Sequence, residues 1–298
     1  MPLTPSQTRA LLLQLGVVPR KNLGQNFLTD GNLVRKSLEL AALVPTDVVV
    51  EIGPGLGTLS EAILAAGAEL FAVEVDRQLD RNLRESLLPK FPEKFHLLEG
   101  DAVAHPRAGL PDDHPALRHG TYKVIANLPY AISTPWLDAL LAGPLPEQMV
   151  LMLQREAAAR FTAAPGTAER GAISIFTEAA FTPAGSHPVS RTCFSPEPKV
   201  DSTLLRLHRR PDARAFHPFT KKLIREFFTH RRKQIGALIR LVDGNSKLPA
   251  PRSLLPALTA WLNHLRALSF DHRARPEDLP LAAWLELDNA LGPNSGTE

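Results

Sequence analysis

The sequence has little of several features that mark particular classes of protein. Its 298 residues include a single cysteine, Cys193, which excludes an internal disulfide and a zinc site built from several cysteines. No run approaches the roughly 18 apolar residues that a membrane-spanning helix needs. The short apolar stretch near the N-terminus has no basic region before it, unlike a signal peptide. We therefore expect a cytoplasmic protein with no membrane attachment.

Motifs of common hydrolases are absent as well. The ten histidines form no His-Glu-x-x-His pattern, so the sequence offers no zinc-protease helix. There is no Gly-x-Ser-x-Gly turn of the kind that carries the nucleophile of serine hydrolases. We expect neither a metal site nor a serine nucleophile.

Net positive charge is absent from most of the chain and concentrated in one segment. Residues 206–240 contain eleven lysines and arginines against two acids, a net charge of +9, whereas the whole chain carries only +3. Such asymmetry favours a polyanion-binding face beside a neutral or acidic body, although an ordinary solvated helix face is the alternative. Arg231, Arg232 and Lys233 are the best candidates for phosphate contact, because three consecutive cations cannot all be hidden in a helix core.

Strand-like and helix-like segments alternate in the first half of the chain. Continuous apolar runs predict buried parallel strands at 47–52, 69–75, 94–98, 122–126 and 148–153. Helical patterns at 58–66 and 77–88 lie between them. This order predicts an α/β fold with an open parallel sheet that binds ligands at the carboxyl ends of its strands.

The pattern changes in the second half. Residues 180–207 are strand-like and rich in proline and serine, which suits a late antiparallel pair at the sheet edge. After Arg210 and Pro211 the chain reads as helices with basic and apolar faces. We therefore expect two domains, a sheet domain over 1–209 and a smaller α-helical domain over 210–298.

A glycine-rich turn follows the first strand. Glu51 precedes Gly53, Gly55 and Gly57, and glycines let a backbone turn sharply and approach a ligand closely. The dinucleotide fingerprint would need a glycine at position 58, where Thr58 stands. Gly-x-Gly-x-Gly after an acid is instead typical of class I (Rossmann-like) methyltransferases that use S-adenosylmethionine.

Two further acids end the next strands. Glu74 could accept hydrogen bonds from both ribose hydroxyls of such a cofactor, and Asp101 could accept one from its adenine amino group. Asp76 is a rival for the ribose role. Each acid could alternatively be a helix cap or a solvated strand end, but the joint pattern favours a cofactor site.

The fourth strand ends in Asn127-Leu128-Pro129-Tyr130. An adenine amino nitrogen is a poor nucleophile because its lone pair is delocalised into the ring. The side-chain oxygen of Asn127 and the main-chain carbonyl of Pro129 could accept its two hydrogens, while Tyr130 stacks on the base. These contacts predict methyl transfer to adenine by positioning and electrostatics. A proline turn that caps the next helix is the structural alternative.

The sequence resembles the ribosomal RNA adenine dimethylases, specifically their small-subunit branch, up to about residue 240. The resemblance rests on several motifs, KNLGQNFL at 21–28, EIGPGLGTLS at 51–60, AVEVD at 72–76, EGDA at 99–102, NLPY at 127–130, LQREAAARF at 153–161, FSPEPKVDS at 194–202 and RRK at 231–233. It implies that Asn26 and Leu28 contact S-adenosylmethionine alongside Gly53, Glu74, Asp101 and Asn127, and that Phe194 stacks against the target base.

The resemblance also implies the partner. The substrate would be two adjacent adenosines in the 3′-terminal hairpin of small-subunit rRNA, each dimethylated within an assembling small ribosomal subunit by a monomeric enzyme. Two positions depart from the family pattern, because Ala131 replaces a usual asparagine and Arg170 a common tyrosine. Three alternatives remain, namely a large-subunit rRNA methyltransferase, an RNA-binding assembly factor without activity and an NAD-dependent oxidoreductase.

Overall fold

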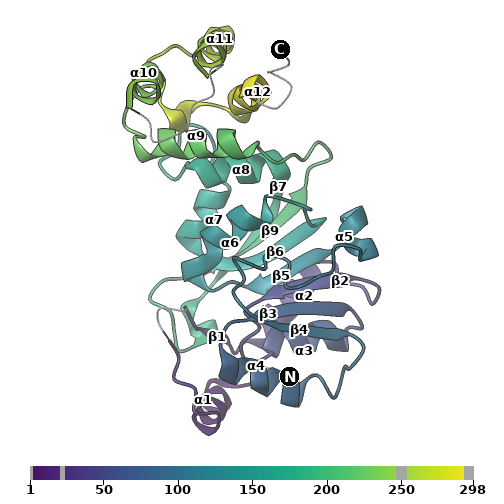
Figure 1. Cartoon of the computed structure of the whole chain (residues 1–298). Coiled ribbons are helices and arrows are strands. Elements are labelled where there is room, and N and C mark those ends of the chain that lie inside the picture. Colours follow the sequence, from purple (N-terminus) through teal and green to yellow (C-terminus); the bar gives the residue numbers. More distant parts are fainter. Residues whose placement is uncertain (1–2, 21–23, 246–253, 292–298) are drawn as a thin grey trace. The chain divides into compact units, whose positions relative to one another are not determined.

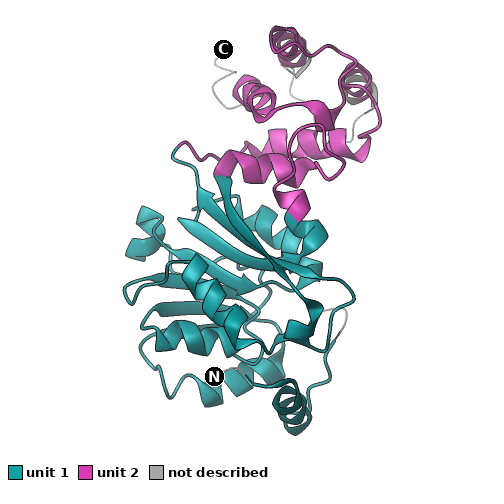
Figure 2. Cartoon of the chain, turned by 180° about the vertical axis from the view of Figure 1, so that it is seen from behind, with its two compact units in different colours: residues 1–158, 181–211 teal, residues 159–180, 212–298 magenta. Residues whose placement is uncertain are grey.

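The computed structural model describes residues 3–20, 24–245 and 254–291. The chain divides into two compact units (Figure 2): unit 1 contains residues 1–158 and 181–211, and unit 2 contains residues 159–180 and 212–298. The observed division falls two residues after the expected boundary at 209 and assigns residues 159–180 to the second unit.

Unit 1 is built on a seven-stranded sheet with the order β4-β3-β2-β5-β6-β9-β7. The first five strands in that order are parallel, and β9 runs antiparallel to both β6 and β7. The strands are β2 (Val48–Ile52), β3 (Glu69–Glu74), β4 (Phe95–Glu99), β5 (Lys123–Asn127), β6 (Gln148–Gln154), β7 (Phe181–Val189) and β9 (Ser202–Arg209). The α/β fold and the late antiparallel pair predicted from the sequence are confirmed.

The central strands form because their residues are buried on both faces. All five residues of β2 are buried, and so are five of the six in β3, as a parallel sheet covered by helices requires. Figures 1 and 2 view the chain from opposite sides, and both show helices in front of the sheet. The strand order reverses between β2 and β5, which is where such sheets open a crevice at their carboxyl ends.

Helices and a second small sheet complete unit 1. The helices in its described part are α1 (Pro5–Gln14), α2 (Gly31–Leu40), α3 (Thr58–Ala65), α4 (Arg77–Ser86), α5 (Pro115–His119) and α6 (Ser133–Leu140). The small sheet pairs β1 (Phe27–Leu28) with β8 (Phe194–Ser195) in antiparallel register. This pairing fixes the N-terminal arm, residues 24–28, against a segment much later in the sequence. The helix α7 (Arg155–Phe161) leads the chain from unit 1 into unit 2.

Unit 2 is helical. It contains α8 (Ala172–Ala180), α9 (Pro218–Thr229), α10 (Ile235–Asn245), α11 (Leu254–Ala267) and α12 (Leu281–Leu291). Its core is aromatic: the rings of Phe227 and Trp261 lie 6.2 Å apart, and those of Trp261 and Trp284 lie 5.5 Å apart. Within the described ranges, every helix is too short or too polar to cross a bilayer.

Arg170 is buried in unit 2. Its side chain donates to the carbonyl oxygens of Ala163 at 2.7 Å and Leu279 at 3.4 Å, and forms an ion pair of 2.8 Å with Glu178. This departure from the family pattern therefore serves the packing of unit 2, where it joins two loops and a helix.

Candidate functional site

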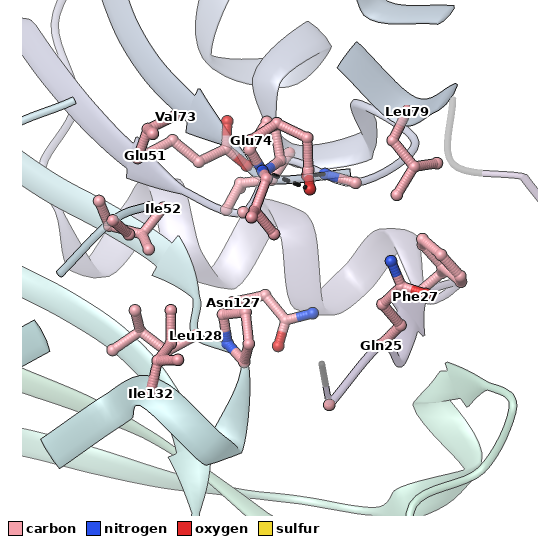
Figure 3. A pocket seen from close by; sticks show the side chains of 18 of the residues that line it. Gln25, Phe27, Glu51, Ile52, Val73, Glu74, Leu79, Asn127, Leu128 and Ile132 are labelled. Atoms are coloured by element: carbon pink, nitrogen blue, oxygen red, sulfur yellow. Dashed lines mark hydrogen bonds between the residues drawn. The ribbon is translucent and has the colours of Figure 1, made fainter. Parts of the chain in front are cut away.

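A cavity of about 330 Å³ opens at the carboxyl ends of the central strands (Figure 3). The ends of β2, β3 and β5, the turn after β4 and the N-terminal arm all contribute to its wall. Figure 3 shows Glu74 and Asn127 reaching the cavity from different strands, with Phe27 of the arm beside it. The residues that the sequence places far apart thus meet at the crevice that the strand order creates.

Two glycines let backbone segments close around Pro129 and Tyr130. Gly53 has a φ of +66°, and a Cβ at this position would lie 3.1 Å from Cγ of Pro129. Gly24 has a φ of +64°, and a Cβ there would lie 3.0 Å from the main-chain nitrogen of Tyr130. Any larger residue at either site would combine backbone strain with a steric clash. The glycine-rich turn and the arm therefore hold the loop after β5 from two sides.

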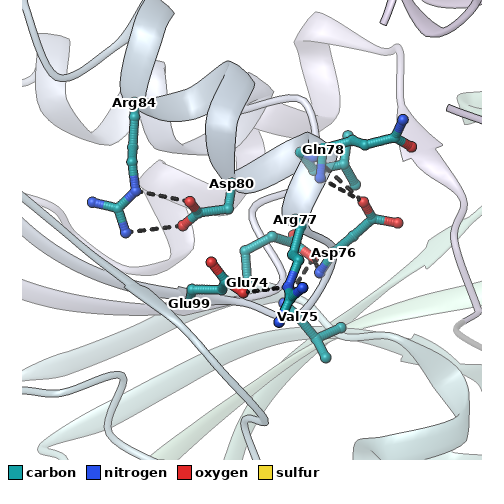
Figure 4. Close-up of polar contacts among 9 residues, drawn as sticks. Glu74, Val75, Asp76, Arg77, Gln78, Asp80, Arg84 and Glu99 are labelled. Carbon is teal, nitrogen blue, oxygen red and sulfur yellow. Dashed lines mark hydrogen bonds and ion pairs between the residues drawn. The ribbon is translucent and has the colours of Figure 1, made fainter. Parts of the chain in front are cut away.

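Glu74 is buried, and main-chain amides surround its carboxylate. The amide of Gly55 donates to Oε2 at 3.0 Å. The amides of Val75 and Asp76 donate to Oε1 at 3.0 and 2.9 Å (Figure 4). Burial raises the pKa of Glu74, while these hydrogen bonds oppose the rise. Because each carboxylate oxygen has two lone pairs, Oε2 keeps capacity for a further donor from a ligand.

Asp76 and Asp101 have different surroundings. Oδ1 of Asp76 caps α4 by accepting from Gln78 at 3.0 Å, and Oδ2 accepts from the side chain of Gln25 at 3.2 Å. Asp76 is buried and does not line the cavity, so it is less suited than Glu74 to the ribose role. Asp101 is exposed and lines the cavity; its Oδ1 accepts from the amide of Val103 at 2.9 Å.

Glu51 also lines the cavity but is almost fully buried at the end of β2. Burial raises its pKa to about 8, against the opposing effect of a 2.6 Å hydrogen bond from the hydroxyl of Ser60. The carboxyl group is therefore largely neutral at physiological pH when the cavity holds no cation.

Asn127 ends β5 with a fixed amide orientation. Its Nδ2 donates to the main-chain oxygen of Asn26 at 3.1 Å, and a carbonyl oxygen can only accept. The nitrogen must therefore face the arm, which leaves Oδ1 as the acceptor available to a ligand. The carbonyl oxygen of Pro129 already accepts from the amide of Ile132 at 3.1 Å and retains a second lone pair.

The two aromatic candidates differ in accessibility. Tyr130 lines the cavity, and its hydroxyl oxygen lies 2.6 Å from Oγ of Ser202. Phe194 is only 2% exposed and packs in the hydrophobic core with Leu28 and Leu33, outside the cavity wall. A ring buried in this way cannot stack on a base unless it leaves the core, so the stacking of Phe194 stays a prediction.

The cavity wall has acidic side chains and no basic ones. Among the described residues that line it, the acids are Glu51, Glu74 and Asp101, with no lysine, arginine or histidine. Such a wall suits a ligand with positive charge and offers no side-chain cation for a pyrophosphate. The described residues contain no cluster of histidine, cysteine and carboxylate side chains suited to a metal ion.

The cavity gathers most of the residues that the sequence singles out. These are Asn26, Leu28, Gly53, Gly55, Glu74, Asp101, Asn127, Pro129 and Tyr130. Sequence reasoning missed Gln25 as a wall residue and Ser202 as the partner of Tyr130. Both lie inside motifs quoted above, so the motifs could have marked them as candidates. No pattern along the chain, however, indicates which side chains come into contact.

Most of the basic segment, residues 212–240, lies in unit 2, whereas Arg206, Arg209 and Arg210 belong to unit 1. Arg232 and Lys233 are exposed, whereas Arg231 donates to the carbonyl oxygen of Ala168 at 2.9 Å and lies 3.7 Å from Glu277. Arg231 therefore uses part of its hydrogen-bonding capacity within the unit.

A second basic stretch lies beside this segment. The amides of Ile235 and Gly236 at the start of α10 donate to the carbonyl oxygens of Ala274 and His272 at 2.8 and 2.9 Å. These hydrogen bonds bring the loop that carries Arg273 and Arg275, both exposed, next to the start of α10.

Comparisons with known proteins identify the family. A sequence model described as "Ribosomal RNA adenine dimethylase" matches residues 18–255. Proteins named "Ribosomal RNA small subunit methyltransferase A" are similar over nearly the whole chain. The one from Opitutus terrae is 54% identical, covering 96% of this chain and 98% of the relative, and the one from Moorella thermoacetica is 41% identical, covering 97% and 98%.

Solved structures share the fold. A dimethyladenosine transferase from Plasmodium falciparum matches with a TM-score of 0.68 and 24% identity, covering 88% of this chain and 95% of the other. The 23S rRNA methyltransferase ErmE matches with a TM-score of 0.59 and 24% identity, covering 89% and 99%. Taken with a parallel sheet that gathers the glycine-rich turn, Glu74 and the NLPY loop around one cavity, these matches show that the chain belongs to the ribosomal RNA adenine dimethylase family.

Proposed function

We propose that this protein transfers methyl groups from S-adenosylmethionine to the exocyclic amino groups of two adjacent adenosines in the 3′-terminal hairpin of small-subunit rRNA. It would act as a monomer in the cytoplasm, on an assembling small subunit. The family match and the relatives' name support a methyltransferase acting on small-subunit rRNA. The observation that carries the proposal is the position of Asn127, whose side-chain oxygen is left for a ligand at the edge of a cavity lined by acids.

The cavity fits the cofactor chemically. S-adenosylmethionine carries a positive sulfonium and an ammonium group, and the wall offers Glu51, Glu74 and Asp101 without an opposing cation. Glu74 would accept from the ribose hydroxyls through its remaining acceptor capacity, and Asp101 from the adenine amino group. Asn26, Leu28, Gly53 and Gly55 would enclose the rest. When bound, the cofactor supplies an electrophilic methyl group.

The loop after β5 would hold the acceptor base. Oδ1 of Asn127 and the carbonyl oxygen of Pro129 would each accept one amino hydrogen. These contacts favour a pyramidal nitrogen whose lone pair is directed at the methyl group and is no longer delocalised into the ring. Tyr130 would stack on the base. Since an adenine paired within a duplex cannot reach this cavity, the target base must be in a loop or be flipped out.

Unit 2 would bind RNA through phosphates. Arg232 and Lys233 are exposed cations in the segment of net charge +9, and the loop with Arg273 and Arg275 lies beside them. Arg231 would contribute less, because Ala168 and Glu277 already engage it. Phosphate contacts of this kind position an RNA without reading its sequence.

One experiment tests the proposal directly. Small ribosomal subunits that lack the modification are incubated with the purified protein and labelled S-adenosylmethionine, and the methylated positions are mapped. We expect two neighbouring dimethyladenosines in the 3′-terminal hairpin, with no label when Asn127→Ala replaces the wild type. Label that appears only when large subunits replace the small ones, or saturable binding to the small subunit without any transfer, would assign the protein to one of the alternatives.

A further inference from the structure

The backbone of Tyr130 and the hydroxyl at the tip of its ring are both held by contacts. Its backbone follows Pro129 at the end of β5, and Gly24 of the arm packs against its main-chain nitrogen. Its carbonyl oxygen accepts from the hydroxyl of Ser133 at 3.1 Å. At the far end of the ring, the hydroxyl oxygen lies 2.6 Å from Oγ of Ser202. Because the backbone and the ring tip are both fixed, the two side-chain torsions of Tyr130 are restricted together.

Ser202 is a rigid anchor for that contact. It is the first residue of β9 and is 1% exposed. It pairs with Gln154 of β6 on one side and with Val189 of β7 on the other, so its backbone lies between two strands. Its hydroxyl is therefore held by the sheet rather than by a loop, which gives the precise support that a preorganised site needs.

A phenol hydroxyl that is partly buried, as that of Tyr130 is, usually has a hydrogen-bonding partner. Burial raises the pKa of Tyr130, so its hydroxyl keeps its proton and can either donate to Ser202 or accept from it. A phenylalanine would present the same ring face to a base but could not make this contact. The hydroxyl thus has a use that stacking alone does not explain.

We propose that Ser202 is a positioning residue for methyl transfer: through the hydroxyl of Tyr130 it fixes the ring on which the target adenine rests. This inference rests on the proposed function, in which Tyr130 stacks on the acceptor base. Ser202 itself touches neither cofactor nor base. Its effect appears in the rate at which a bound adenine reacts, because a small misplacement of the acceptor nitrogen costs much of the gain from proximity.

A double-mutant cycle tests the inference, with Ser202→Ala, Tyr130→Phe and the combined variant. We expect each single change to slow single-turnover transfer at saturating cofactor and RNA by about 3–10-fold, the usual value of one hydrogen bond. The combined variant should be no slower than the slower single variant, because both changes remove the same bond. Cofactor affinity should stay within about twofold of wild type.

Ser37→Ala is the matched control. Ser37 is also 1% exposed in unit 1, and its hydroxyl donates to the carbonyl oxygen of Leu33, away from the cavity wall. It should lower the melting temperature without slowing transfer. Ser202→Cys keeps the approximate size of the side chain but hydrogen-bonds weakly, and it should slow transfer nearly as much as Ser202→Ala.

The outcomes distinguish a failure of this inference from a failure of the proposed function. Wild-type rates in Ser202→Ala and Tyr130→Phe, or rate reductions that add in the combined variant, overturn the positioning role. A reduction in Ser37→Ala equal to that in Ser202→Ala would also overturn it, since the effect would then be one of stability. In each case methylation of small-subunit rRNA by the wild-type protein leaves the proposed function standing, whereas its absence removes that function too.

Discussion

The side-chain amide of Asn127 donates a hydrogen bond of 3.1 Å to the main-chain oxygen of Asn26, across 101 residues of sequence. The contact ties the end of β5 to the N-terminal arm and selects one of the two orientations of the amide. The same arm residue donates from its side chain to the carbonyl oxygen of Gly24 at 3.0 Å, which keeps the arm in shape. The orientation of the Asn127 amide therefore depends on the arm as much as on the strand.

Asn127→Ala should lower the rate of methyl transfer at least about 100-fold, comparable to the removal of one preorganised transition-state interaction. RNA binding should survive, because the change lies in unit 1 and leaves the basic segment intact. Single-turnover measurements at saturating cofactor separate chemistry from cofactor binding. Asn127→Asp is the control for the orientation: it keeps the acceptor but cannot donate to Asn26, and we expect an intermediate rate. A near-normal rate for Asn127→Ala would refute its role.

Glu74→Ala should weaken S-adenosylmethionine binding by about 1.5–3 kcal/mol, the usual range for a hydrogen bond to a charged group. The matched variant is Asp76→Asn, which preserves an efficient helix cap and should leave cofactor affinity nearly unchanged. Titration calorimetry on the three proteins decides between the two acids, and NAD should show no saturable binding. Equal affinity in wild type and Glu74→Ala, with weaker binding in Asp76→Asn, would transfer the ribose role to Asp76.

Glu51 should make the ligand-free protein less stable as pH rises. Its folded pKa is about 8 against an ordinary value of 4.5, so between these values the folded protein binds more protons than the unfolded chain. Stability therefore declines across this window, at up to about 1.4 kcal/mol per pH unit. Glu51→Gln should reduce the decline while keeping an acceptor for Ser60, and the share that comes from Glu74, whose pKa burial also raises, should remain.

Melting temperatures at about pH 5 and about pH 8 provide the measurement. Glu61→Gln is the control, because Glu61 pairs with Lys90 on the surface of α3. It should follow the wild-type pH dependence. Parallel curves for wild type and Glu51→Gln would contradict the assignment of this carboxyl group.

Combined Arg232→Gln and Lys233→Gln changes should flatten the dependence of log affinity for small-subunit RNA on log salt concentration. The slope should fall by about 0.7–0.9 for each phosphate that the variant no longer neutralises. Filter binding over a salt series measures it, and cofactor affinity should not change. Arg231→Gln should change the slope less, since Arg231 is already engaged within unit 2, and Lys36→Gln on α2 is the control. An unaltered slope in the well-folded double variant would leave the basic segment without this role.

Arg170→Met should destabilise unit 2 by about 1–3 kcal/mol, because it leaves the carbonyl oxygens of Ala163 and Leu279 without their buried donor and Glu178, which is partly exposed, without its ion-pair partner. Denaturant unfolding followed by tryptophan fluorescence reports this change, since Trp261 and Trp284 lie in the core of the unit. The exposed Arg273→Met is the control and should change stability by less than about 0.5 kcal/mol. A similar small effect for Arg170→Met would show that its hydrogen bonds are dispensable.

Much of unit 1 could be predicted from the sequence because its strands are buried on both faces. Continuous apolar runs predicted both ends of each strand from β2 to β6 to within one residue. The acids and Asn127 lie at or near the carboxyl ends of those strands. The side chains at the ends of these strands lie close together, because parallel strands bring their carboxyl ends to the same edge of the sheet. The cavity follows from local patterns together with that rule.

The remaining features depend on contacts between distant segments. The two-residue pairing of β1 with β8 is too short to leave a period in the sequence. The burial of Phe194 and the contact of Tyr130 with Ser202 depend on where β9 enters the sheet. The apolar run of α8, Ala172–Ala180, does indicate a buried helix, but only the folded chain shows that it belongs with the helices after residue 211.

Residues 159–180 belong to unit 2, although the segments before and after them belong to unit 1. This excursion of the chain into unit 2 affects folding during synthesis and the effect of cutting the chain. Strands β7 and β9 follow that excursion in the sequence, yet β9 must insert between β6 and β7 to complete the sheet. During synthesis on a ribosome, the sheet therefore cannot close until residues up to about 209 have emerged, when α8 is already present without α9 and α12. No single cut separates the two units: a cut after residue 211 leaves residues 159–180 of unit 2 with unit 1, and a fragment ending before residue 159 would lack both antiparallel strands and the partner of Tyr130.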